Sequence, residues 1–240
     1  MAFTEQERAE LGERAAEIIA RYPKSRSALL PLLHLVQAAE GFVSGDGVAF
    51  CAEQLGLSEA EVTAVVSFYT MYKRRPVGEY HVGVCTNTLC AIMGGDTIHA
   101  ELRSHLGIED DETTPDGKIS LERVECNAAC DYAPVVMVNW EFFDNQTPES
   151  ARELVDGLRA GADIAPSRGA DRLVGWREAA RILAGYPDDQ ATTGRTAGQP
   201  TLAGLRIAKE NGWTPESGGG ADSADSAAPQ RSTAGNGGRP

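Results

Sequence analysis

Residues 80–90 have the sequence Tyr80-His81-Val82-Gly83-Val84-Cys85-Thr86-Asn87-Thr88-Leu89-Cys90. The apolar side chains in its first half recur at every second position, a period that predicts a β-strand with one buried face. This strand ends at Cys85, and Cys90 follows after a gap of four residues. A second pair, Cys126 and Cys130, follows a second predicted strand around residues 119–122, with three residues between the cysteines.

In an open α/β sheet, the loops that follow the strands converge on one edge, so the two cysteine pairs are expected to meet there. Spacing alone leaves three interpretations. A thiol redox pair normally uses Cys-x-x-Cys, which neither gap matches. Structural zinc accepts both gaps, and an iron–sulfur cluster also takes four thiolates. The spacing therefore disfavours a redox pair and leaves zinc and a cluster equally open.

The surroundings of the first pair suit a negatively charged metal cluster. Gly94-Gly95 and a helix that begins nearby offer backbone N–H groups, and Thr86 and Thr88 offer hydroxyl groups. Several apolar residues are expected to keep water away on one side, which together with hydrogen bonds sets a reduction potential. They are Leu89, Ile92, Met93, Ala133, Pro134 and Val135.

Helical patterns precede the strand and one follows the second cysteine pair. Apolar spacing and capping signals predict helices at residues 4–22, 29–40, 47–55 and 58–68. The apolar spacing of residues 98–106 predicts another, and residues 135–138 and 140–143 are predicted as strands. Thr147 as N-cap and Pro148 at the first helical position predict a closing helix to residue 158. Residues 172–184 fit a short helix, whereas Ser217–Pro240 has hardly any large apolar side chain and is expected to be disordered.

Composition excludes several classes of function. The 240 residues include 35 acidic and 22 basic side chains, a formal net charge of −13, which disfavours nucleic-acid binding. The longest apolar stretch, about 28–36, is too short and too interrupted to cross a bilayer. The acidic start, Met1–Glu7, lacks the features of a secretion signal, so the reducing cytoplasm is expected.

Other candidate residues have simpler interpretations. Cys51 is predicted to be a core residue, and the scattered histidines at 34, 81, 99 and 105 to be ordinary surface or core residues. The aromatic stretch 68–72 either packs as a helix end or forms part of a subunit interface. The basic connector Lys73-Arg74-Arg75 is either a solvated turn or a docking point for an acidic partner. No Gly-x-Gly-x-x-Gly or phosphate-binding loop is present, so a nicotinamide or flavin site is expected on another polypeptide.

Several longer runs carry a family resemblance. They are Leu32-Leu33-His34-Leu35-Val36-Gln37, Ser67-Phe68-Tyr69, Pro76-Val77-Gly78-Glu79-Tyr80-His81-Val82, Thr113-Thr114-Pro115-Asp116-Gly117-Lys118-Ile119-Ser120-Leu121, Cys126-Asn127-Ala128-Ala129-Cys130 and Ala133-Pro134. Over roughly residues 5–160, the sequence resembles the 24-kilodalton subunits of respiratory complex I, an NADH:quinone oxidoreductase.

The resemblance implies an α/β fold: a thioredoxin-like ferredoxin domain over 73–162, preceded by an N-terminal helical bundle over 1–72. The extension over 163–240 lies outside the resemblance, and its composition predicts that it is largely disordered. It implies a [2Fe-2S] cluster on Cys85, Cys90, Cys126 and Cys130. This cluster would exchange single electrons with FMN on a flavoprotein subunit that binds NADH, among the other peripheral-arm subunits, at the cytoplasmic face of the membrane. Related subunits of NAD-linked hydrogenases and formate dehydrogenases remain an alternative, as does a structural-zinc module.

One position departs from the family pattern. The second loop often reads Cys-Leu-Gly-Ala-Cys in the family, whereas this chain has Asn127 and Ala128 at the Leu and Gly positions. If that Gly has a positive φ, Ala128 is expected to be strained.

Overall fold

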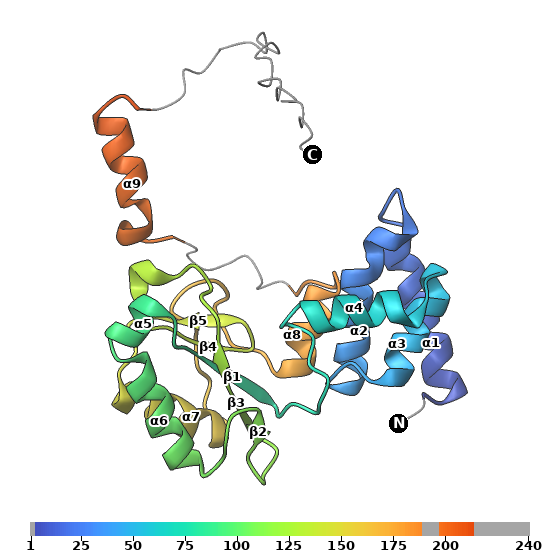
Figure 1. The fold of residues 1–240 in the computed structure, drawn as a ribbon, viewed down its shortest axis with the longest axis horizontal. Coiled ribbons are helices and arrows are strands. Elements are labelled where there is room, and N and C mark those ends of the chain that lie inside the picture. Colours follow the sequence, from blue (N-terminus) through green and yellow to red (C-terminus); the bar gives the residue numbers. More distant parts are fainter. Residues whose placement is uncertain (1–2, 189–196, 214–240) are drawn as a thin grey trace, which may run out of the picture. The chain divides into compact units, whose positions relative to one another are not determined.

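The structure is a computed structural model that describes residues 3–188 and 197–213 (Figure 1). Residues up to Thr201 form one compact unit, and those from Leu202 form a second. Most of helix α9 (Gln199–Glu210) belongs to the second unit. Within the described residues, no helix is both long and apolar enough to span a membrane. The predicted disorder of Ser217–Pro240 concerns residues outside the described part.

The N-terminal part of the first unit is a group of helices, as predicted. They are α1 (Glu5–Ile19), the 3-10 helix η1 (Ser25–Ala28), α2 (Leu29–Glu40), α3 (Gly45–Leu55) and α4 (Glu59–Phe68). Capping boxes at Thr4 and Ser58 start α1 and α4, and left-handed Gly41 ends α2. Their apolar faces share one buried core, which includes Ile18, Leu33 and Phe50.

A mixed sheet follows, in the strand order β2-β3-β1-β4-β5. Its strands are β1 (Tyr80–Cys85), β2 (Glu112–Thr113), β3 (Ile119–Val124), β4 (Val136–Val138) and β5 (Glu141–Phe143). β1 and β3 are parallel, with Cys85 opposite Val124, and the other neighbours are antiparallel. The sequence pattern did not predict the two-residue strand β2.

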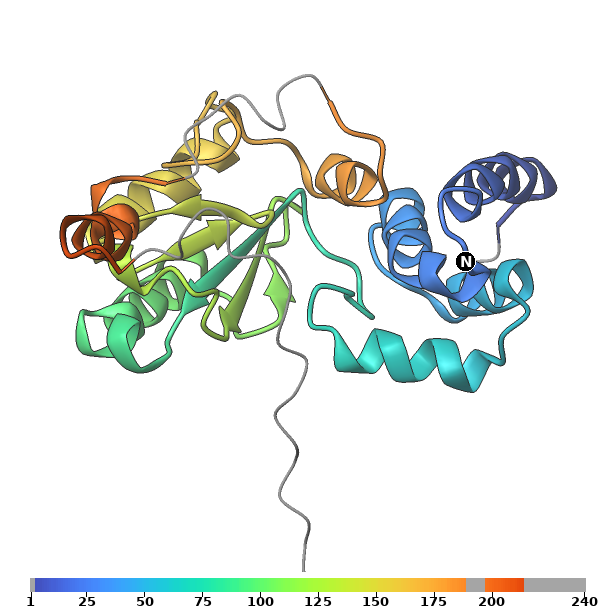
Figure 2. The same ribbon diagram turned by 90° about the horizontal axis from the view of Figure 1, so that it is seen from above.

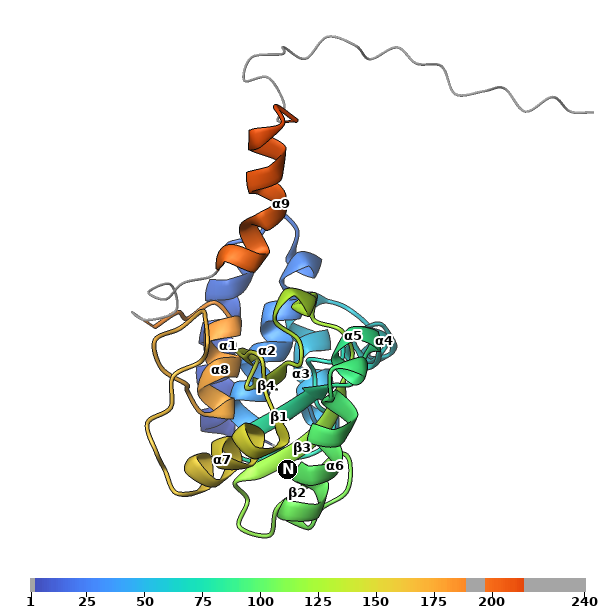
Figure 3. The same cartoon turned by 90° about the vertical axis from the view of Figure 1, so that its left-hand side faces the viewer.

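Two helices cover one face of this sheet. Figure 3 shows α6 (Gly95–Leu106) and α7 (Pro148–Arg159) next to each other in front of β1 and β3. The alternate residues Val82 and Val84 of β1 share a buried core with both helices. His81 lies on the opposite face, because side chains alternate along a strand.

Residues after α7 return to the N-terminal helices. The predicted helix within 172–184 is α8 (Trp176–Leu183), which packs along α2 (Figures 1 and 2). The Trp176 indole donates a hydrogen bond of 2.6 Å to the Gly41 carbonyl, and the side chain is buried. Arg177 donates to the Ala39 and Glu40 carbonyls at the end of α2. This part of the extension expected over 163–240 is therefore ordered. Its indole and guanidinium groups donate hydrogen bonds to backbone carbonyls at the C-terminal end of α2.

Candidate metal centre

The four candidate cysteines come from two loops that leave the sheet at one edge. Cys85 is the last residue of β1, and Cys90 lies in the short helix α5 (Thr88–Ile92). Cys126 stands two residues after the end of β3, and Cys130 begins the 3-10 helix η2 (Cys130–Tyr132). Because β1 and β3 run parallel in register, both loops start at the same level.

The cysteines meet, as the strand pattern predicts. All four line one small cavity together with Asn127, Ala129 and Val135. The Sγ atoms of Cys126 and Cys130 lie 3.5 Å apart. Cys85 and Cys90 are buried, whereas Cys126 and Cys130 are exposed. The loops therefore present a sulfur site that is closed by protein on one side and open on the other.

Two of the thiols hold their protons more firmly than an ordinary cysteine. Burial, together with a hydrogen bond to Cys85, raises the pKa of Cys90 to about 11. The hydrogen bond with Cys126 raises the pKa of Cys130. Thiolate ligands must lose their protons to a metal, so binding of a metal by these cysteines would release protons.

The donor set fits an iron–sulfur cluster. Four sulfurs are the usual ligands of a [2Fe-2S] cluster, in which two irons share them. Among residues 3–188 and 197–213, no three His, Cys, Asp or Glu side chains are placed to hold one metal ion. A binuclear cluster does not need three protein ligands around one metal ion, since each iron takes only two protein sulfurs.

The backbone of both loops is tightly constrained. Ala128 has φ of 56°, so the prediction of a strained position in the second loop is confirmed. A Cβ at Gly95 would lie 2.5 Å from the Cys85 carbonyl oxygen and 2.9 Å from that of Cys90, which requires glycine at the start of α6. The Gly94 N–H donates to the Ala91 carbonyl at 3.0 Å and is thus used within the turn.

The apolar shield is only partly as predicted. Ala133 and Val135 are buried in a small core with the inner cysteines, together with Met137. Ile92, by contrast, is 77% exposed, and Leu89 and Met93 are also exposed. The prediction that these three keep water away was wrong, because all three are exposed, and Leu89 and Ile92 line an open hollow next to the cysteines.

The remaining candidates lie away from the cysteines. Cys51 is fully buried in the helical core, and burial raises its pKa to about 12, which confirms the predicted core role. None of the four histidines lines the cysteine cavity. His105 Nε2 lies 2.6 Å from Asp156, and His34 packs on Tyr72.

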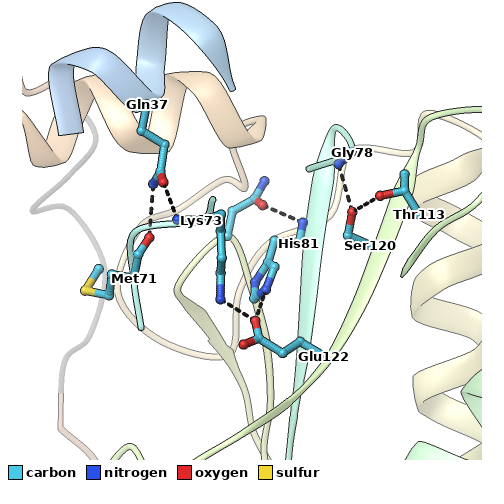
Figure 4. Close-up of polar contacts among 9 residues, drawn as sticks. Gln37, Met71, Lys73, Gly78, His81, Thr113, Ser120 and Glu122 are labelled. Carbon is cyan, nitrogen blue, oxygen red and sulfur yellow. Dashed lines mark hydrogen bonds and ion pairs between the residues drawn. The ribbon is translucent and has the colours of Figure 1, made fainter. Parts of the chain in front are cut away.

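On the sheet face opposite α6 and α7 lies a buried polar cluster, which no pattern in the sequence predicted. Figure 4 shows Lys73 and His81 directed at the carboxylate of Glu122. His81 Nε2 lies 2.5 Å from Glu122 Oε2, and its ring packs at a tilted angle against both Trp140 and Trp176, which also contact each other. Burial lowers the pKa of His81, and its hydrogen bond lowers the pKa of Glu122 against the opposing effect of burial.

Known proteins similar to this chain identify its family. The profile of the thioredoxin-like [2Fe-2S] ferredoxin family matches residues 15–159. An NADH-quinone oxidoreductase subunit of Mycobacterium bovis is 65% identical over 198 residues, which cover 82% of this chain and 78% of that protein. The corresponding NADH-quinone oxidoreductase subunit of Rickettsia bellii is 40% identical over 60% of this chain and 89% of its own length.

Among solved structures, an NAD+-reducing [NiFe]-hydrogenase covers 54% of this chain and 23% of its own, with a TM-score of 0.48 and 18% identity. The family profile and the mycobacterial relative are far more specific. On these two matches, the chain belongs to the thioredoxin-like [2Fe-2S] ferredoxin family, in the branch of the NADH-quinone oxidoreductase subunits.

Proposed function

We propose that Cys85, Cys90, Cys126 and Cys130 hold a [2Fe-2S] cluster and that the chain carries single electrons within an NADH:quinone oxidoreductase. The observation that supports this ligand set is that all four side chains line the same small cavity. When bound, such a cluster supplies a centre that accepts and donates one electron at a time. The hydride chemistry of NADH then belongs to a flavin on another polypeptide.

The chain's own residues would hold and insulate the cluster. The buried Cys85 and Cys90 anchor it from the protein side, where Val135 and Met137 exclude water. Backbone packing at Gly95 fixes the first loop against α6. These contacts determine the polarity around the sulfurs, which is one of the quantities that set a reduction potential.

The open side of the site suits electron exchange with a partner. The four cysteines also line a hollow of about 270 Å³ with Asn87, Thr88, Leu89 and Ile92. An exposed apolar side chain such as Ile92 offers apolar surface that a partner would bury in an interface. We assign this side to the flavoprotein subunit that binds NADH and FMN, within a peripheral arm at the cytoplasmic face of the cell membrane.

We also propose a division of the chain at about residues 72 and 162. It is supported by the two separate buried cores, one of helices and one under the sheet. Residues after 162 then form a third segment, of which α8 is attached to the helices.

The test is a serine scan with metal analysis. Each cysteine is replaced in turn by serine, and iron, sulfide and zinc are measured in anaerobically purified protein together with visible absorption and electron paramagnetic resonance spectra. We expect about two irons and two sulfides per wild-type chain. Cys85→Ser, Cys90→Ser, Cys126→Ser or Cys130→Ser should remove or alter the signal.

Cys51→Ser is the matched control. Cys51 lies in the helical core, so its substitution should leave the spectrum unchanged. Stoichiometric zinc without visible absorption would contradict the proposal in favour of a structural-zinc module.

A further inference from the structure

A second concave site lies between the helices and the open face of the sheet. It is a cavity of about 320 Å³ at the connector between α4 and β1. Tyr69 and Arg75 stand on the connector side, and His81 and Glu122 on the sheet side. None of its residues is a cysteine, so the site is separate from the candidate metal centre.

The charges at the base of this cavity are already satisfied. Glu122 accepts hydrogen bonds from both Lys73 and His81 (Figure 4). The Lys73 ammonium also lies over the Trp140 ring, 5.4 Å from its centroid. The Lys73 backbone N–H donates to Gln37 at 2.8 Å, which fixes the start of the connector. These contacts fix the base of the cavity, and because the Lys73 and Glu122 charges pair with each other, neither is available to a ligand.

Arg74 and Arg75 are different. Both line the cavity and both are exposed. Neither makes a hydrogen bond, ion pair or ring contact with any residue in 3–188 or 197–213. The single further carboxylate at the cavity is that of Asp111, so the two guanidinium groups leave a local excess of positive charge. In a chain of net charge −13, such an excess is a feature that needs a partner.

Aromatic side chains stand beside these arginines. Phe68, the last residue of α4, is 77% exposed, and Tyr69 is 44% exposed. Their rings meet edge to face with centroids 5.0 Å apart, and Tyr69 meets Tyr72 in the same way at 6.3 Å. The Tyr72 hydroxyl donates to the Leu30 carbonyl at 2.9 Å, which fixes this stack on α2. Rigid, exposed aromatic and arginine side chains are the residues that dominate binding energy at protein interfaces.

We propose that Phe68, Tyr69, Arg74 and Arg75 form a docking surface for an acidic segment of another polypeptide. The two guanidinium groups pair with carboxylates of that segment, and the aromatic rings bury one of its apolar side chains. The inference does not rest on the proposed cluster, because it uses only the connector and the end of α4. The occupant is acidic because the unpaired charge at the site is positive.

The experiment uses the full chain in its native assembly. A photo-crosslinking benzoylphenylalanine replaces Phe68, and the crosslinked peptide is identified by mass spectrometry. We expect crosslinks to one Asp- and Glu-rich segment of one other polypeptide of the assembly. The double substitution Arg74→Glu and Arg75→Glu should lower the crosslink yield about tenfold, because it removes two exposed charge pairs worth about 1.4 kcal/mol together.

The control is Arg14→Glu with Lys24→Glu, which changes the net charge by the same amount at exposed positions of the helical part. This variant should keep the wild-type yield. Arg74→Gln with Arg75→Gln provides a milder variant if charge reversal prevents folding, and it should also lower the yield. Crosslinks to residues 214–240 of the same chain, to a second copy, or to no protein would overturn the proposal. So would equal losses of yield in the Arg74/Arg75 variant and the Arg14/Lys24 control.

Discussion

At the scale of single residues, Ala128 holds the least favourable backbone conformation of the second cysteine loop. Its φ of 56° costs an L-residue about 1–2 kcal/mol, a cost that glycine does not have. Glycine loses roughly 0.5–1 kcal/mol through its greater freedom in the unfolded chain. We therefore expect Ala128→Gly to raise the free energy of unfolding by about 0.5–1 kcal/mol, measured by denaturant unfolding of the metal-loaded chain.

Ala129→Gly serves as the control, because Ala129 has φ of −108° and gains nothing from glycine. That substitution should lower stability. If both glycine variants lower the free energy of unfolding, the positive φ of Ala128 does not destabilise the folded chain.

His34 makes the stability of the helices depend on pH. It is 7% exposed, and burial lowers its pKa to about 4, so the folded chain keeps the ring neutral where the unfolded chain protonates it. This contribution is fully present above about pH 6.5 and is lost as the pH falls toward 4. A shift of this size corresponds to roughly 3 kcal/mol. Denaturant unfolding at several pH values should show that loss in the wild type and a shallower slope in His34→Gln, and parallel slopes would contradict the assignment.

At the scale of helices and strands, local signals in the sequence predicted most of the architecture. The capping boxes of α1 and α4 and the Thr147-Pro148 start of α7 lie where the sequence places them. The period of two in the apolar residues predicted β1. The rule that parallel strands end at one edge of a sheet predicted that the two cysteine loops meet, as they do. The caps and the strand period succeed because each is set by residues at most four positions apart, whereas the meeting of the cysteine loops, 41 positions apart, follows from the topology of a parallel strand pair.

Features that depend on distant residues left no such signal. Glu122 is 41 residues from His81 and 49 from Lys73, and no periodic pattern predicts that three ionisable groups meet on one face of a sheet. The exposure of Ile92 likewise depends on the direction in which the five-residue helix α5 leaves β1. The sequence therefore predicted that the four cysteines meet, and it did not predict the polar cluster of Lys73, His81 and Glu122.

At the scale of the whole molecule, Trp176 of α8 joins the N-terminal helices to the sheet. Its indole N–H donates to the Gly41 carbonyl at the end of α2, 135 positions earlier in the chain. The same ring packs at a tilted angle against His81 of β1 and against Trp140, with centroids 5.3 Å and 5.8 Å away. One side chain thus contacts the helices and the sheet at once, which couples their unfolding.

Trp176→Ala should remove this coupling. Deleting a buried tryptophan costs about 3–5 kcal/mol, and the lost hydrogen bond leaves the Gly41 carbonyl without its indole donor. We expect calorimetry to show a lower midpoint and two transitions in place of one, the helices and the sheet unfolding separately. Trp213→Ala is the control, because Trp213 is 71% exposed in the second unit and its loss should change stability by less than about 0.5 kcal/mol. A single wild-type transition in Trp176→Ala would mean that the contact between Lys73 on the connector and Gln37 of α2 suffices to couple the helices to the sheet.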